Sequence, residues 1–462
     1  MTKTSLKTKM RELDPNVRQT NFAEVAIGYT QEEAQEEAKR CLQCKHKPCV
    51  NGCPVNVPIP SFIHEIVKGN VNAAYQTIQT ENALPAICGR VCPQERQCEK
   101  ECVRAHKGEA VAIGRLERFV ADYFLQKQKN KPTPKPTKKQ KVAIIGSGPA
   151  GITCAGELAK KGYSVTVFEA LHEIGGVLQY GIPAFRLPKA LVEKEIAQVR
   201  QLGVHFVTNV IVGRSFTIDD LLTQGYASVF IGSGAGLPRF QGIPGENLNG
   251  IYAANEFLTR VNLMHAHNFP KEATPVSIGK KVCVIGGGNV AMDCARTAKR
   301  LGAPSVQIVY RRSEEELPAR IEEIKHAKEE GITFSMLTNP ESFIGKDGWV
   351  TSMRCVEMEL GKKDSSGRRR PQVKEGSHFC MDTDTVIIAI GQSPNPLLHR
   401  TTPDLQTHDW GGIIIDKATM ATSKEGVYAG GDVVSGAATV IEAMGAGKQA
   451  AKQMDKYMQK KD

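Results

Sequence analysis

The sequence predicts an α/β protein in which two Rossmann-like dinucleotide-binding domains follow an α-helical, cysteine-rich domain. Three observations predict this fold. Residues 1–126 combine helix-like stretches with eight cysteines, and the lysine- and proline-rich tract 127–140 separates them from the rest. A β-rich run, a glycine turn and a helical run then occur twice, from Lys141 and from Lys281. Two such units in one chain indicate two nucleotide-binding domains with parallel sheets.

Length and composition restrict the class of protein. The chain has 462 residues, 41% hydrophobic and 24% charged, which suits two or three domains that each bury a core. It has no apolar run of 18 residues and a polar N-terminus, so we expect no membrane span, no signal peptide and a cytoplasmic location.

The net charge is +11, and seven lysines lie between Lys127 and Lys141. We interpret this tract as a solvated linker. A docking surface for an acidic redox partner is the alternative, and we expect no nucleic-acid partner.

The cysteines indicate a metal-containing region. Eight of the 13 cysteines lie between Cys41 and Cys102, and disulfides do not persist in a reducing compartment. They form the runs C-x2-C-x4-C-x3-C-P and C-x3-C-P-x4-C-x3-C, of which the first is similar to a ferredoxin run. Zinc is the alternative, because C-x2-C also occurs in zinc sites. Two runs of this kind beside redox-type nucleotide domains favour two [4Fe-4S] clusters.

The first glycine turn has the pattern expected for a dinucleotide. Gly146, Gly148 and Gly151 form G-x-G-x-x-G around Pro149 and Ala150, directly after a predicted strand. These glycines permit the tight turn, the approach of a pyrophosphate and close packing of helix on strand. The following helix directs its N–H groups at the phosphates. Glu169 ends the next strand, where a carboxylate binds ribose hydroxyls.

The second glycine turn predicts NADPH. Gly286, Gly287, Gly288, Asn289, Val290 and Ala291 form the variant G-x-G-x-x-A. Arg311 and Arg312 stand where the first unit has Glu169, and arginines suit a 2′-phosphate. Arg320 is either a further contact or a solvated helix residue. We also expect Ala389 and Gly391 to bind a cofactor.

The C-terminal run GVYAGGDVVSGAATVIEAMGAGKQAA is similar to the flavin-binding segment of flavoproteins with two dinucleotide domains. This resemblance implies that Gly431, Asp432 and Thr439 bind FAD and that the FAD domain is split. We therefore expect an iron–sulfur domain at 1–126, a linker at 127–140, an FAD domain at 141–240 and 385–462, and an NADPH domain at 241–384.

Nearly the whole chain resembles the small subunit of glutamate synthase and its relatives, the large subunit of NADH-dependent ferredoxin:NADP oxidoreductase and sulfide dehydrogenase. The motifs that carry the resemblance are CLQCKHKPCVNGCPV, ICGRVCPQERQCEKEC, AIGRLERF, VAIIGSGPAG, IGGVLQYGIPAFRLPK, GGGNVAMD, VYRR and AGGDVV.

The resemblance implies contacts of Val177 and Arg186 with FAD. It also implies one cluster held by Cys41, Cys44, Cys49 and Cys102, and another held by Cys53, Cys92, Cys98 and Glu117. Cys88 is then a thiol that binds no iron, whereas spacing alone makes it a ligand.

The implied activity is electron transfer from NADPH through FAD and the clusters to a partner. That partner is a catalytic glutamate synthase subunit or a ferredoxin-type redox subunit, in an oligomer or hetero-complex. Electron bifurcation and a flavin-free scaffold are the alternatives. We expect no catalytic side chain, and we expect Asp293 and Glu442 to be ordinary helix residues.

Overall fold

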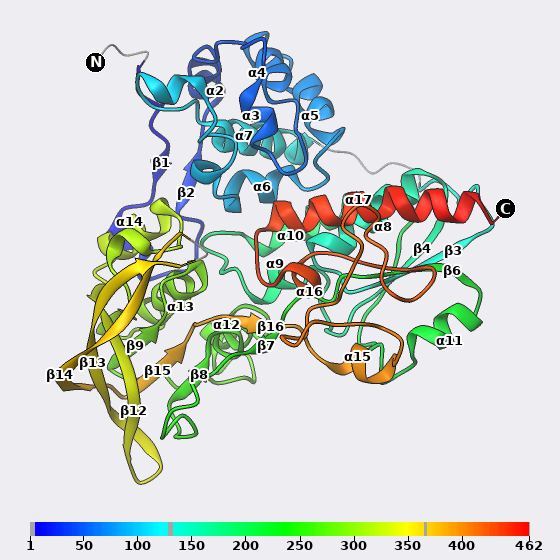
Figure 1. The fold of residues 1–462 in the computed structure, drawn as a ribbon. Coiled ribbons are helices and arrows are strands. Elements are labelled where there is room, and N and C mark those ends of the chain that lie inside the picture. Colours follow the sequence, from blue (N-terminus) through cyan, green and yellow to red (C-terminus); the bar gives the residue numbers. More distant parts are fainter. Residues whose placement is uncertain (1–4, 128–132, 365–366, 462) are drawn as a thin grey trace.

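The computed structural model describes residues 5–127, 133–364 and 367–461. A helical domain lies at the top in Figure 1, with one α/β unit below it at the right and a second at the left. None of the described helices has the length and apolar character that a bilayer crossing requires.

The helical domain consists of short helices joined by cysteine-containing loops. Its first long helix begins at a capping box in which Thr30 Oγ accepts from Glu33 N and the Glu33 carboxylate accepts from Thr30 N. Proline occupies the first turn of three later helices, where its missing N–H costs nothing. The helices are α2 (Gln31–Ala38), α3 (Pro48–Asn51), α4 (Ile59–Val67), α5 (Val71–Gln79), α6 (Pro85–Val91) and α7 (Ile113–Lys127), with 3-10 turns at Gln94–Arg96 and Val103–His106.

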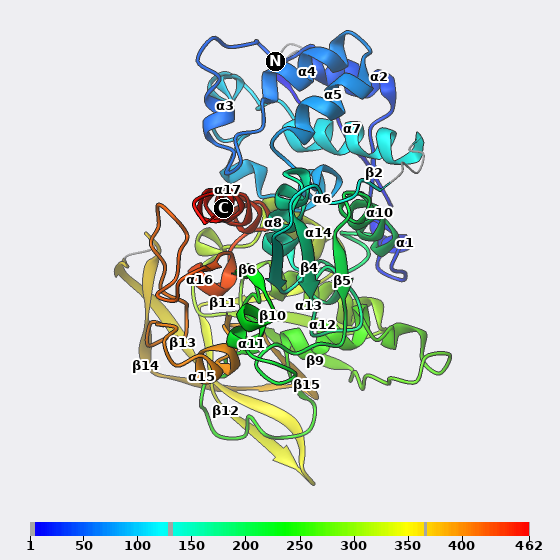
Figure 2. The same cartoon turned by 90° about the vertical axis from the view of Figure 1, so that its right-hand side faces the viewer.

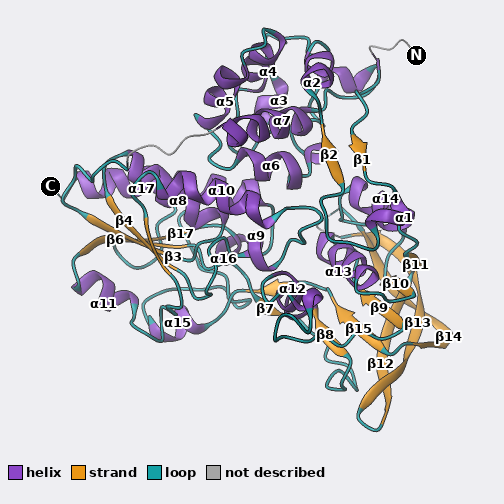
Figure 3. Cartoon of the chain, turned by 180° about the vertical axis from the view of Figure 1, so that it is seen from behind, coloured by secondary structure: helices purple, strands orange, loops and turns teal. Residues whose placement is uncertain are grey.

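An N-terminal arm connects the helical domain with the second α/β unit. It contains β1 (Arg11–Glu12), α1 (Pro15–Arg18) and β2 (Ala26–Gly28), and the two strands pair antiparallel. Figures 1 and 3 show the arm running down beside α14 (Ile321–Glu329). These residues lie within the predicted helical domain 1–126, but the arm extends to the second α/β unit, a contact that the sequence does not predict.

The first α/β unit contains a five-stranded parallel sheet in the order β17-β6-β3-β4-β5. The edge strand β17 comes from the C-terminal part of the chain, whereas the other four strands precede the second unit, as a split domain requires. Its strands are β3 (Lys141–Ile145), β4 (Ser164–Phe168), β5 (His205–Val207), β6 (Tyr226–Ile231) and β17 (Val427–Ala429). Its helices are α8 (Pro149–Lys160), α9 (Val177–Tyr180), α10 (Lys189–Arg200), α11 (Ile218–Thr223), α15 (Leu397–Thr401), α16 (Asp432–Ser435) and α17 (Val440–Gln459).

The second unit has a parallel sheet in the order β11-β10-β9-β15-β8 and an antiparallel sheet that extends outward in Figure 1. The parallel strands are β8 (Ile251–Ala253), β9 (Lys281–Ile285), β10 (Ser305–Tyr310), β11 (Thr333–Met336) and β15 (Thr385–Ile388). The antiparallel strands are β12 (Thr338–Lys346), β13 (Trp349–Lys363) and β14 (Arg369–Asp382). Besides α14, the unit contains α12 (Ala254–Asn262), α13 (Asn289–Arg300), and 3-10 turns at Ala266–Asn268 and Glu314–Glu316.

One boundary differs from the sequence-based division. β15 begins at residue 385, where we expected the chain to re-enter the first unit, but it pairs with β8 and β9 of the second sheet. The chain returns after β16 (Gln392–Ser393), which pairs antiparallel with β7 (Leu237–Pro238). Part of the expected linker, 128–132, lies outside the described residues, and Thr137 and Lys138 donate backbone hydrogen bonds to Gly162 of the first unit.

A continuous hydrophobic core joins the helical domain to the first unit. It includes Ile87 of α6, Leu116 of α7 and Met444 of α17, all completely buried. The second unit has a separate core around Val284 and Met292. The cysteine-containing loops are therefore packed against the first nucleotide domain, and α6 lies beside α10 and α17 in both views (Figures 1 and 2).

Candidate functional site

The first glycine turn joins β3 to α8 and leaves a space for a phosphate group. Gly146 has φ +96°, and a Cβ there would lie 2.6 Å from Gly232 O. A Cβ on Gly151 would lie 2.0 Å from Gly146 O, so the turn and the helix packing both require glycine. Gly148, by contrast, faces open space at the N-terminus of α8. The residues present fit a pyrophosphate that approaches Gly148.

Glu169 and the glycine pair Gly175–Gly176 pack against this loop. Glu169 Oε2 accepts hydrogen bonds from Ser147 N (2.9 Å) and Ser147 Oγ (2.5 Å). Gly175 N in turn donates to Ser147 Oγ, and a Cβ on Gly176 would lie 3.0 Å from Gly148 Cα. Val177, the first residue of α9, therefore follows a turn that contacts the first glycine loop.

Lys189 is a residue of this site that sequence reasoning missed. Its partly buried Nζ donates to the carbonyls of Leu178 (2.8 Å) and Ile182, and so it holds α9 in place. Burial lowers the pKa of Lys189 to about 7. The available signal was its position at the end of the quoted motif IGGVLQYGIPAFRLPK.

The C-terminal segment reaches the same edge of the first sheet. A Cβ on Gly431 (φ +78°) would lie 3.0 Å from the Ala150 side chain, so Asp432 lies close to the start of α8. Burial raises the pKa of Asp432. Thr439 is the N-cap of α17, and Glu442 completes a capping box with it. Glu442 therefore has the structural role expected of it.

The second glycine turn repeats this geometry between β9 and α13. A Cβ on Gly286 (φ +138°) would lie 2.3 Å from Ala389 O, which brings the residue after β15 against the turn. Gly288 and Gly391 both face open space. Asn289 Oδ1 accepts from Arg320 N at 2.9 Å, and Val290 is exposed beside it. The residues present fit a second dinucleotide.

The two arginines after β10 have different environments. Arg311 is exposed and makes no ion pair with any described residue. Arg312 is buried, and its Nη2 lies 2.8 Å from Asp364 Oδ2 while its Nε donates to Arg369 O. Arg312 thus binds the hairpin between β13 and β14, and only Arg311 is available for a phosphate.

Arg320 has neither of the two roles considered for it. It is buried, and it donates to Arg90 O (2.7 Å) and to Gln94 Oε1 (3.0 Å) in the helical domain. Arg96, two residues after Gln94 in the same 3-10 turn, donates to the Pro318 and Ala319 carbonyls. These bonds connect the loop after the second nucleotide site with the second cysteine run.

Arg186 joins the two α/β units. Its Nη1 donates to both carboxylate oxygens of Asp293 (2.8 and 2.7 Å), and its Nε lies 3.0 Å from Glu323 Oε1. All three side chains are buried. Asp293 is therefore an interdomain ion-pair partner, and the expectation that it is an ordinary helix residue is wrong. The contact of Arg186 with FAD stays a prediction, since carboxylates surround its guanidinium here.

The structure brings the cysteines together in two cavities. One is lined by Cys41, Cys44, Cys49 and Cys102, and the other by Cys53, Cys88, Cys92, Cys98 and Glu117. Burial raises the pKa of Cys49 and Cys53 to about 11, so these two thiols release protons when they bind a metal at neutral pH.

The spacing of the thiols argues against zinc. Four ligands around one zinc ion, each about 2.3 Å from it, lie about 3.8 Å apart. Among the described residues, the group of His, Cys, Asp and Glu whose ligand atoms all lie within 4.8 Å of one another is Glu12, Glu322 and His326, and it includes no cysteine. No three cysteine thiols in the described part of the chain lie that close together, a spacing that fits a polynuclear cluster better than a single zinc ion.

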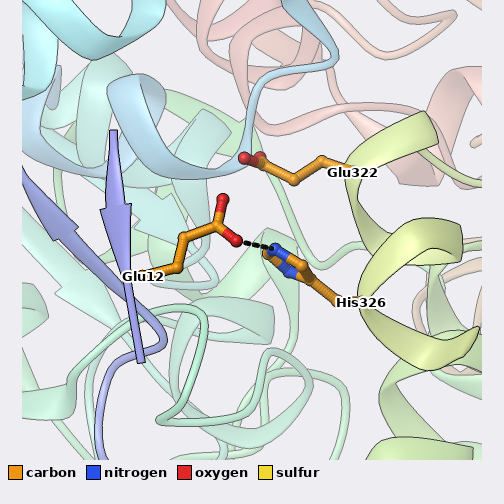
Figure 4. Close-up of side chains that lie close together, drawn as sticks. All are labelled: Glu12, Glu322 and His326. Atoms are coloured by element: carbon orange, nitrogen blue, oxygen red, sulfur yellow. Dashed lines mark ion pairs between the residues drawn. The ribbon is translucent and has the colours of Figure 1, made fainter. Parts of the chain in front are cut away.

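Glu12 and His326 fasten the arm to α14, and Glu322 of the same helix lies beside them (Figure 4). His326 Nε2 lies 3.2 Å from Glu12 Oε2. Each carboxylate also has a cationic neighbour, because Lys325 Nζ is 3.7 Å from Glu12 and Arg320 Nη2 is 3.2 Å from Glu322. Protein cations already neutralise this group, which explains its position without a metal ion.

Glu117 and Cys88 both lie at the second cavity. Glu117 is buried, its Oε1 accepts from Asn82 Nδ2 at 2.7 Å, and burial raises its pKa to about 7. The Cys88 sulfur lies 3.7 Å from Asn82 Oδ1 and 3.6 Å from the Met444 sulfur. The structure thus retains both candidates for the fourth ligand.

Comparison with known families assigns a class to each part of the chain. Residues 18–129 match the dihydropyrimidine dehydrogenase domain II, 4Fe-4S cluster family, and residues 140–447 match the pyridine nucleotide-disulphide oxidoreductase family. The fold of the second part is shared with FprA of Mycobacterium tuberculosis (TM-score 0.59, 22% identity, 70% of this chain and 85% of that chain). The chain is therefore a pyridine nucleotide oxidoreductase with an iron–sulfur domain.

Similar proteins narrow this class. The glutamate synthase [NADPH] small chain of Azospirillum brasilense is 38% identical, over 96% of this chain and 93% of its own length. That of Escherichia coli is 35% identical, over 96% of both chains. The NADP(+)-dependent formate dehydrogenase subunit beta of Moorella thermoacetica is 39% identical, but this chain spans only 60% of it.

The chain belongs to the family of the glutamate synthase small chains. The expected NADPH-dependent oxidoreductase with FAD and [4Fe-4S] cofactors is confirmed. Its relatives include small and beta subunits of enzymes with several subunits, which supports a hetero-complex.

Proposed function

We propose that the chain is the electron-input subunit of a glutamate synthase, which takes electrons from NADPH and delivers them to a separate catalytic subunit. FAD supplies hydride acceptance, and the clusters supply one-electron transfer. The protein binds and orients these groups and excludes water around them.

The placement of the cysteine cavities carries this proposal. The cavity with Cys53, Cys92 and Cys98 is lined by Ile441 of α17, the helix that follows Asp432 and Thr439. Cys92 and Cys98 are buried, whereas the other cavity is lined by partly exposed cysteines and opens beside the exposed side chain of Leu42. The two cysteine sites thus lead from the FAD domain to the surface of the helical domain.

Residue roles follow from this arrangement. Gly148 and the N-terminus of α8 receive the FAD pyrophosphate, and Gly288 with α13 receives that of NADPH. Arg311 binds the 2′-phosphate. Lys189 keeps α9 against the first glycine turn.

The share of each relative's length that this chain spans favours the glutamate synthase assignment. The chain spans 93–96% of two glutamate synthase small chains, whereas it spans only 60–64% of the formate dehydrogenase and NADPH-Fe(3+) oxidoreductase beta subunits.

Cofactor analysis and reconstitution test the proposal. Anaerobically purified protein should contain about one FAD and about eight irons per chain, as two four-iron clusters require. NADPH should bleach its absorbance, and addition of a large glutamate synthase subunit should give NADPH-dependent glutamate formation. Stoichiometric zinc with little iron, or bleaching without glutamate formation, would contradict the cluster or the partner assignment respectively.

A further inference from the structure

The surface around the first cysteine cavity is strongly basic. The segments 39–50 and 100–107 border this cavity and contain seven Lys and Arg residues but one carboxylate, Glu101. All five lysines of these segments are exposed and make no ion pair with any described residue; they are Lys39, Lys45, Lys47, Lys100 and Lys107. Their charge is therefore not neutralised within the part of the chain that the structure describes.

Two apolar side chains lie within this basic surface. Leu42 is 52% exposed and Val103 is 39% exposed, and both line the cavity together with the four cysteines. Large exposed apolar side chains surrounded by polar residues are typical of protein–protein contacts. Here they lie directly over the metal site that is nearer to solvent.

Charge distinguishes this surface from the second cavity. The second cavity is lined by the buried carboxylate Glu117 and by Ile441 of the FAD domain, so neighbouring parts of the chain already cover it. Only the first cavity combines exposure, apolar side chains and excess positive charge.

We propose that this surface, formed by 39–50 and 100–107, is the docking site for an electron-accepting protein whose own redox centre is surrounded by carboxylates. The inference rests on the proposed function and adds to it the place and the charge of the partner surface. Opposite charges accelerate encounter, and the apolar centre excludes water from the contact. In such a complex, the exposed side chains of Leu42 and Val103 lie between the first cluster and the partner protein.

The test measures electron transfer from NADPH to two protein probes of opposite charge, an acidic ferredoxin and the basic protein cytochrome c, with the cofactor-loaded chain. The variants are Lys45→Glu/Lys47→Glu and Lys39→Glu/Lys107→Glu; the second leaves the loop from Cys44 to Cys49 intact. The matched control is Lys271→Glu/Lys417→Glu, which makes the same charge change at exposed lysines of the two α/β units.

We expect the second-order rate with ferredoxin to fall by about tenfold or more in both surface variants and to be unchanged in the control. It should also fall as salt rises from about 0.01 to 0.15 M, whereas the rate with cytochrome c should rise in the surface variants. The proposal is overturned if the rate with ferredoxin falls equally in the control, or does not fall in the surface variants. It is also overturned if the rates with ferredoxin and cytochrome c fall by the same factor in the surface variants. Bleaching of the flavin and cluster absorbance by NADPH without an acceptor reports the proposed function separately.

Discussion

Two adjacent arginines at the second nucleotide site have separate roles. The Arg311 side chain is exposed, whereas Arg312 binds Asp364 and the Arg369 carbonyl. A charge-assisted bond to a 2′-phosphate contributes roughly 1.5–3 kcal/mol. We expect Arg311→Gln to weaken NADPH binding by about 10- to 150-fold while NADH binding is retained, as measured by flavin reduction rates against nucleotide concentration.

The neighbouring residue provides the control. Arg312→Gln should lower the thermal unfolding temperature, because it leaves Asp364 without its guanidinium partner, and should affect both nucleotides alike. Equal loss of NADPH and NADH in the Arg311 variant would show that Arg311 does not read the phosphate.

The fourth ligand of the second cluster can be identified by two single changes. Glu117 and Cys88 line the same cavity and both contact Asn82, and the Cys88 sulfur also lies 3.6 Å from the Met444 sulfur. We expect Cys88→Ser to retain both clusters, and Glu117→Ala to change the electron paramagnetic resonance spectrum or potential of one cluster, because an oxygen ligand is harder than a thiolate. FAD reduction by NADPH should survive in both. Loss of a cluster in Cys88→Ser with no effect of Glu117→Ala would reverse the assignment.

At the scale of elements, the turn between β3 and α8 separates a folding role from a binding role. A Cβ at position 151 would lie 2.0 Å from Gly146 O, whereas one at position 148 meets nothing, and Gly148 has φ −69°. We expect Gly148→Ala to keep the thermal stability of the flavin-free protein but to reduce bound FAD per chain. Gly151→Ala should lower stability itself. A Gly148→Ala protein with full FAD content would show that the phosphate does not approach this residue.

The N-terminal arm gives a pH-dependent contribution to stability. The hydrogen bond with His326 lowers the pKa of Glu12 from 4.5 to about 2. Because the folded value is below the unfolded one, this contribution is complete above about pH 4.5 and is lost as the pH falls toward 2. We expect Glu12→Gln to lower the free energy of unfolding at pH 7 by about 1.5–3 kcal/mol, and by progressively less below pH 4.5.

Denaturant unfolding of the wild type and the variant over this pH range measures the difference. Glu36→Gln is the control, because Glu36 is an exposed residue of α2. A difference between wild type and Glu12→Gln that stays constant from pH 7 to pH 3 would contradict the assigned contact.

At the scale of the whole molecule, one buried carboxylate joins the arm to the second α/β unit. Glu330 contacts Arg18 at 2.9 Å, Arg296 at 2.8 Å and Arg300 at 2.6 Å, and it is buried together with all three. Removing one partner of a buried ion pair costs about 3–5 kcal/mol, because the remaining charges are uncompensated. We expect Glu330→Gln to lower the free energy of unfolding by this amount, as measured by denaturant unfolding.

The adjacent Glu329 tests the role of burial. It contacts the same Arg18 at 2.6 Å, but its side chain is 34% exposed, so Glu329→Gln should cost only about 0–1 kcal/mol. Similar small losses in both variants would show that the buried ion pairs do not hold the arm in place.

Features that depend on neighbouring residues could be predicted from the amino-acid sequence. The turns at Gly146 and Gly286 and the two cysteine runs were predictable, because a glycine turn or a metal-binding loop is specified within a few residues. The split of the first domain and the grouping of the cysteines into two sets came from resemblance to a known family.

The roles of the buried charges depend on contacts between distant parts of the chain. Arg312 binds Asp364, Arg186 binds Asp293, and Arg18 binds Glu330, which is 312 residues away. Sequence spacing carries no information about such partners, and a buried charge is stable only beside its counter-charge. The same limit applies to β15, because a strand's pattern does not say which of two parallel sheets it completes. The exposed basic surface around the first cysteine cavity likewise depends on the tertiary structure, because the fold places 39–50 beside 100–107.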